Sequence, residues 1–81
     1  MQLFYTDRFR RSYADAPVQI QRRCDKQLML LVQDLRHPSL RAKKYDEARN
    51  IWQARVTRGW RFYFKMESGV YNLLDVMPHP K

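Results

Sequence analysis

Hydrophobic and polar side chains alternate along the second half of the chain, between Ile51 and Val76. The even-numbered positions are mostly apolar: Trp52, Ala54, Val56, Trp60, Phe62, Phe64, Met66, Val70, Leu74 and Val76. The odd-numbered positions carry charged, polar and tyrosine side chains: Gln53, Arg55, Thr57, Arg61, Tyr63, Lys65, Tyr71 and Asp75. Because neighbouring side chains of a strand point to opposite faces, this pattern predicts a sheet with one apolar face and one open, cationic face. Asn72 alone does not fit the apolar face.

Two short turns divide this region into three strands. Thr57-Arg58-Gly59 and Glu67-Ser68-Gly69 each place a glycine where a tight turn favours positive φ. Since the connections are short, we expect the strands to pair as an antiparallel meander. The β-prone run Gln2 to Tyr5 predicts one more strand at the start of the chain.

A helical periodicity precedes the strands. Ile20, Cys24, Leu28, Leu31 and Leu35 recur at spacings of four, four, three and four, which predicts an amphipathic helix. Pro17 fits the first turn of this helix, and His37-Pro38 should end it, because a residue before proline resists helical ψ. A shorter helix before it begins with a Thr6 or Asp7 cap and ends at Asp15-Ala16-Pro17, with Phe9 and Tyr13 on one face.

These elements predict one α+β domain over residues 1–81. The apolar face of the sheet needs a cover, and the two helices offer matching apolar stripes. We therefore expect the order β-α-α-β-β-β, with two N-terminal helices packed on one face of a twisted antiparallel sheet. Residues 39–49 are expected to be a basic linker.

The charge balance indicates an anionic partner. The 81 residues contain 16 Lys and Arg, eleven of them Arg, against 8 Asp and Glu, for a net charge of +8. This excess favours a polyanion or an acidic protein as partner over a role in solubility alone. Cys24 is the only cysteine and no zinc-ligand spacing occurs, so no metal or cofactor is expected. No long apolar segment occurs, so we expect a soluble, cytoplasmic protein without a membrane partner.

Arg61 is the main candidate for chemistry on the open face. It would hold a phosphate or stabilise a phosphoryl transition state; the alternative is an ordinary strand arginine paired with Asp75. Arg55 lies on the same face as Arg61, and the same two interpretations, a phosphate ligand or an ordinary strand arginine, apply to it. Lys43 and Lys44 would reach a ligand over the sheet, or else belong to a solvated loop.

Other residues on this face complete a possible RNA surface. His79 has the same parity as Arg61, and a histidine is a common general acid, so it would donate a proton to a leaving oxygen; an ordinary surface histidine is the alternative. Tyr63 and Tyr71 would stack on single-stranded bases or pair with each other across the strands. Lys65 lies beside them. Any catalysis would be metal-free.

The ordered set of motifs resembles the RelE/ParE superfamily of toxin–antitoxin toxins. The resemblance rests on His37-Pro-Ser-Leu-Arg41, Lys43-Lys44, Ile51-Trp-Gln-Ala-Arg55-Val-Thr, Trp60-Arg61, Leu73-Leu-Asp-Val76 and His79, with Phe9 and Pro17 in the family's order. It covers nearly the whole chain and implies a helical pair on a twisted antiparallel sheet. Relatives often carry a tyrosine or phenylalanine at or just after the position of His79, where this chain continues with Pro80 and Lys81.

The resemblance also implies a function. The RelE/YoeB-like branch is implied to contain ribosome-dependent mRNA endonucleases (mRNA interferases), which inhibit translation and are neutralised by a cognate antitoxin, here expected to be acidic. Arg61 would hold the scissile phosphate, His79 would be the general acid, and Lys43 or Lys44 would bind the RNA backbone with Arg55. The alternatives are a ParE-like toxin that inhibits gyrase and an inactive relative that only binds its antitoxin.

Overall fold

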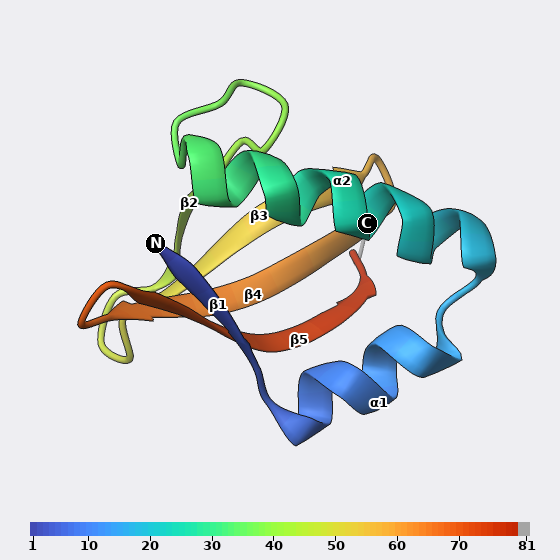
Figure 1. The fold of residues 1–81 in the computed structure, drawn as a ribbon, viewed down its shortest axis with the longest axis horizontal. Helices are drawn as coiled ribbons and strands as arrows, with labels where there is room; N and C mark the ends of the chain where they lie inside the picture. Colours follow the sequence, from blue (N-terminus) through green and yellow to red (C-terminus); the bar gives the residue numbers. More distant parts are fainter. Residues whose placement is uncertain (80–81) are drawn as a thin grey trace.

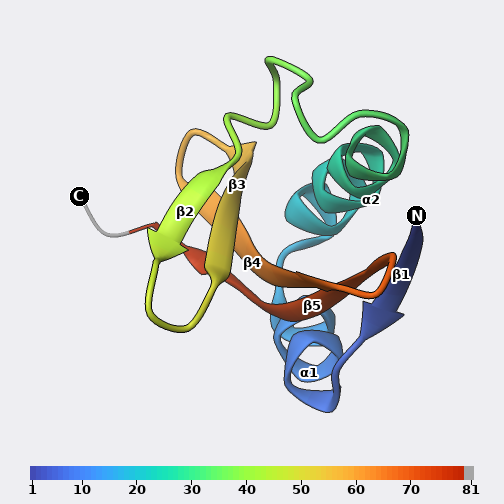
Figure 2. The same cartoon turned by 90° about the vertical axis from the view of Figure 1, so that its left-hand side faces the viewer.

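The computed structural model describes residues 1–79, which form two helices and a five-stranded mixed sheet. The elements in chain order are β1 (Gln2–Tyr5), α1 (Asp7–Asp15), α2 (Val18–Gln33), β2 (Lys43–Asp46), β3 (Ile51–Thr57), β4 (Trp60–Glu67) and β5 (Val70–Pro78). The strand order across the sheet is β1-β5-β4-β3-β2, so β1 and β2 lie at opposite edges (Figure 2). The predicted α+β class is therefore confirmed.

The core lies between the helices and one face of the sheet (Figure 1). Phe9 of α1 and Cys24, Leu28 and Leu31 of α2 are buried. The sheet contributes Ala54, Val56, Phe62, Phe64, Tyr71, Leu73 and Val76. Burial raises the pKa of the Cys24 thiol to about 12, so this cysteine is a protonated packing residue.

The sheet contains two pairings that the alternation pattern did not predict. Residues 43–46, expected to be linker, form β2, whose short, polar sequence carries no apolar stripe. Its place at the edge comes from backbone pairing with β3, in which Lys43 is opposite Gln53. At the other edge β1 runs parallel to β5, with Gln2 opposite Val70, so the sheet is mixed. The pairing of β1 with β5 joins residues far apart in sequence and leaves no local signal.

A β-bulge in β5 reverses the expected parity of its first half. Tyr63 is opposite Asp75 but Phe64 is opposite Leu73, so Leu74 is an extra residue. Beyond a bulge, side chains exchange faces. The expectation that Tyr71 lies on the open face is therefore wrong: it is 3% exposed, in the core, edge-on to Phe64. The same shift removes Asn72 from the apolar face and accounts for its polarity.

The helix boundaries follow their capping groups. The Thr6 hydroxyl caps α1 by accepting from the amide of Phe9 at 3.2 Å. Pro17 is the N-cap of α2 and precedes its first turn. The helix ends at Gln33, earlier than expected, because Asp34 turns the chain: its carboxylate accepts from the Arg36 amide at 2.9 Å.

The two turn glycines provide a matched test of backbone conformation. Gly69 has φ +78° and follows Ser68 at +48°, as the tight β4–β5 hairpin requires. Gly59, contrary to expectation, lies outside the left-handed region. Neither glycine has atoms near the site of an added Cβ. Gly69→Ala should lower the free energy of unfolding by about 1–2 kcal/mol, and Gly59→Ala by less than about 0.5 kcal/mol, in urea denaturation. Equal losses would contradict this assignment.

Candidate functional site

Four arginines gather where the β3–β4 hairpin meets the loop after α2. Arg55 and Arg61 are opposite each other on β3 and β4, and Arg58 lies in the turn between these strands. Partial burial and the neighbouring charges of Arg41, Arg61 and Arg58 lower the pKa of Arg55. We call Arg41, Arg55, Arg58 and Arg61 the arginine cluster.

A buried glutamine holds the loop that brings Arg41 to the cluster. The side-chain amide of Gln27, fully buried on α2, donates to the carbonyl of Arg55 at 2.9 Å and to that of Ser39 at 3.2 Å. The amide of Arg55 in turn donates to the Leu40 carbonyl at 2.7 Å. Helix, loop and β3 are thus joined by hydrogen bonds that are expensive to leave unmade in a buried setting.

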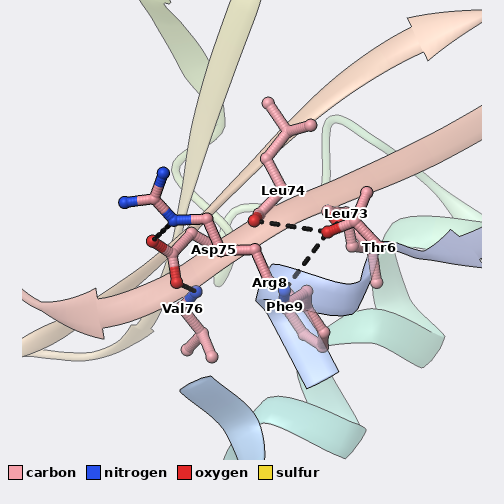
Figure 3. A network of polar contacts seen from close by, with 7 residues as sticks. All are labelled: Thr6, Arg8, Phe9, Leu73, Leu74, Asp75 and Val76. Carbon is pink, nitrogen blue, oxygen red and sulfur yellow. Dashed lines mark hydrogen bonds and ion pairs between the residues drawn. The ribbon is translucent and has the colours of Figure 1, made fainter. Parts of the chain in front are cut away.

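The arginine cluster has no acidic partner among residues 1–79. The ion pairs of this part of the chain are Arg8–Asp75, Lys44–Glu47 and Arg49–Asp46. Asp75, the alternative partner of Arg61, is opposite Tyr63 and binds Arg8 at 3.0 Å instead (Figure 3). Four adjacent cations without a carboxylate create a local positive potential that an anion would neutralise.

The guanidinium of Arg61 is held in place by the turn beneath it. Its Nη1 donates to the carbonyls of Thr57, Arg58 and Trp60 at 2.7, 3.2 and 2.9 Å. Its Nε and Nη2 make no hydrogen bond to any described residue, so they remain available to a ligand. Fixing the side chain in advance reduces the entropy lost when a phosphate binds.

His79 reaches the same edge of the sheet. Pro78 is opposite Trp60, and the amide of His79 donates to the Gly59 carbonyl at 2.8 Å. The structure therefore brings the backbone of His79 to the turn that Arg61 braces. Within the described chain, the buried His79 Nδ1 and Arg55 Nε have no hydrogen-bond partner. Trp52 Nε1 is buried and unpaired among these residues in the same way.

The register distinguishes the two lysines of β2. Lys43 is exposed and opposite Gln53, which has the parity of Arg55 on the open face. Lys44 is opposite Trp52, with its ammonium 5.3 Å from the Trp52 ring centroid and 3.6 Å from Glu47. Lys43 is thus the better placed of the two to meet a ligand on the open face.

Tyr45 is an exposed aromatic of this face that was not among the predicted site residues. Tyr63 is on the predicted face but only 7% exposed, because the ring of Tyr45 meets it edge-on at a centroid distance of 5.0 Å. Tyr45 itself is 63% exposed. It is the extra residue of a bulge between Lys44 and Asp46, which no sequence signal marked. Lys65, half-buried, lies on the same face.

The described residues form neither a metal site nor a membrane-spanning helix. No three His, Cys, Asp or Glu side chains of residues 1–79 come together as a metal site would require. In that same range, neither helix has the length and apolar composition needed to cross a bilayer. Pro80 and Lys81 lie outside the described residues.

Several solved structures with the same fold are toxins or toxin–antitoxin complexes. The YoeB/ParE toxin of Agrobacterium tumefaciens matches with a TM-score of 0.77 and 14% identity over 99% of this chain and 100% of that one. Escherichia coli RelBE matches with 0.77 and 12% over 99% and 98%. The RelB–RelE complex of Methanococcus jannaschii matches with 0.78 and 14% over 93% and 88%. The chain therefore has the RelE/ParE toxin fold, and the resemblance is confirmed at that level.

The similarity to known proteins lies in the fold and does not extend to a sequence match. No protein-family model matches the chain, and no curated protein matches its sequence.

The unpaired arginine cluster predicts anion binding. Phosphate at about ten times its dissociation constant should raise the free energy of unfolding by about 1.4 kcal/mol above sodium chloride of equal ionic strength. Arg58→Ala should lose most of this gain, because it removes one charge of the cluster. The substitution should leave the fold intact, since the Arg58 side chain is exposed and makes no hydrogen bond within the described chain. Arg22→Ala, an exposed position on α2, should retain it. Thermal unfolding measures the difference; equal gains in both variants would contradict a site at the cluster.

Proposed function

We propose that this protein is the toxin of a type II toxin–antitoxin system and cleaves mRNA on the ribosome without a metal ion. The arginine cluster carries the proposal, because its four charges lack a carboxylate partner within residues 1–79 and lie near the β3–β4 turn that the backbone of His79 contacts. The RelE/ParE toxin fold supports it.

The proposed reaction is attack of the RNA 2′-oxygen on the adjacent phosphorus. The 2′-OH loses its proton to water, the bond from phosphorus to the 5′-oxygen breaks, and a 2′,3′-cyclic phosphate and a 5′-OH result. Arg61 stabilises the charge that develops on the phosphoryl oxygens, through the nitrogens that the turn leaves unbonded. His79 protonates the departing 5′-oxygen. Arg55 and Lys43 bind the flanking phosphates.

An acidic antitoxin is the proposed partner. The net charge of +8 favours an acidic chain, and a segment that folds on contact is able to cover a long cationic surface. Several structures with this fold are complexes of a toxin with its antitoxin, among them RelB–RelE and E. coli DinJ–YafQ. By analogy, the cognate antitoxin would inhibit this protein by covering the arginine cluster.

Loss of the Arg61 guanidinium should slow cleavage without unfolding the protein. Arg61→Ala is expected to reduce the single-turnover rate on programmed ribosomes by about 10²–10³-fold, and growth arrest should disappear. Arg61→Lys keeps a charge but loses the forked geometry of the guanidinium, so its cleavage rate should fall between those of the wild type and Arg61→Ala. Arg22→Ala is the matched control. Thermal unfolding checks that the β3–β4 turn survives; a folded Arg61→Ala with the wild-type rate would remove Arg61 from the mechanism.

The role of His79 has a chemical test of its own. His79→Ala should slow cleavage of normal RNA by about 10²–10⁴-fold. An RNA with sulfur in place of the 5′-bridging oxygen has a leaving group that needs no proton, so the variant should cleave it at nearly the wild-type rate. A defect of equal size on both substrates would show that His79 is not the general acid.

A further inference from the structure

A second feature of the open face lies next to the arginine cluster. A cavity of about 580 Å³ opens between the start of α1, the β2–β3 connection and strands β4 and β5. Arg8, Tyr45, Arg49, Tyr63, Lys65 and Asp75 line it. Met77 also lines it and is opposite Arg61, so the cavity continues directly from the cluster. Its volume is within the range of small-ligand sites.

The acidic group in this cavity is the Asp75 carboxylate. Asp75 is 8% exposed, and its oxygens accept from the Val76 amide at 2.9 Å and from Arg8 Nε at 3.0 Å (Figure 3). A carboxylate oxygen accepts more than one hydrogen bond, so each oxygen retains acceptor capacity. The Thr6 hydroxyl donates a hydrogen bond to the Leu73 carbonyl at 2.7 Å and so anchors the end of α1 that carries Arg8. The acceptor is therefore fixed in position.

The walls of the cavity suit a nucleotide. Tyr45 offers a largely exposed ring that Tyr63 supports from the side, and such rings stack on bases of single-stranded RNA. Arg8, Arg49 and Lys65 bring positive charge, which suits the phosphates on either side of a bound base. The Nη atoms of Arg8 make no hydrogen bond within residues 1–79 and remain available.

We propose that the cavity binds one base of the RNA and that Asp75 selects bases carrying an exocyclic amino group. A carboxylate accepts from the N4 amino group of cytosine, whereas uracil would direct its O4 oxygen at the carboxylate. Uracil is therefore disfavoured at this position. This inference rests on the proposed function, in which the arginine cluster holds the neighbouring phosphates. The alternative is that Asp75 serves only as the ion-pair partner of Arg8.

The test compares two pyrimidines that differ at one group. Labelled, 2′-O-methylated pentacytidylate and pentauridylate, which the proposed reaction does not cleave, are titrated by fluorescence anisotropy at one fixed salt concentration. The wild type should bind the cytosine oligomer about tenfold more tightly, which corresponds to about 1.4 kcal/mol. In Asp75→Asn the ratio should fall to less than about twofold, since an amide also donates to uracil O4. Arg8→Gln, which keeps the carboxylate, should weaken both oligomers and preserve the preference.

A substrate variant makes the test independent of protein folding. An oligomer of N4,N4-dimethylcytosine lacks the amino donors, so the wild-type protein should bind it no better than the uracil oligomer. Equal binding of cytosine and uracil oligomers by the wild type, or a cytosine preference unchanged in Asp75→Asn, would overturn base selection. Binding of neither oligomer would overturn it as well. Cleavage on the ribosome would still decide the proposed function separately, because that assay scores cuts anywhere in a message that contains all four bases.

Discussion

Repulsion between like charges across the β3–β4 pair is the constraint on which the site depends. Arg55 and Arg61 are opposite residues of two hydrogen-bonded strands, a position where like charges destabilise a sheet. No carboxylate of the described chain relieves them; carbonyl groups of the turn hold the Arg61 guanidinium, and the Gln27 side chain fixes the backbone of Arg55. A cationic centre kept rigid at a cost in stability is well suited to stabilise an anion that forms only during a reaction.

Two bulges give the open face its shape. The extra residue at Tyr45 in β2 places an exposed ring over Tyr63, and the extra residue at Leu74 in β5 keeps Asp75 on the open face while Tyr71 enters the core. Both bulges increase local twist and re-aim side chains. They turn a flat cationic surface into a cavity with an aromatic wall and a carboxylate, beside the arginine cluster.

The arginine cluster and the cavity around Asp75 would have different tasks in RNA recognition. Phosphate contacts fix the position of a nucleic acid, and contacts to base edges provide sequence preference. In the proposed scheme the arginine cluster performs the first task and the cavity around Asp75 the second. In the same proposed scheme, an acidic antitoxin segment that lies over both would compete with RNA for the same charges, so inhibition would need no conformational change in this protein.

The sequence by itself determined the helices, the three-strand meander, the apolar face of β3 and β4 and the position of Arg55 and Arg61 on the opposite face, because periodicity and capping are local signals. It did not determine β2, the parallel β1–β5 pairing, the burial of Tyr71 or the exposure of Tyr45. The short, polar β2 joins the sheet through backbone pairing with the neighbouring β3, and β1 pairs with a segment that is distant in sequence. The two tyrosines depend on bulges, where one inserted residue exchanges the two faces of a strand. Only the tertiary structure, through the loop held by Gln27 and the return of β5 to the β3–β4 turn, brought Arg41 and His79 to the same edge.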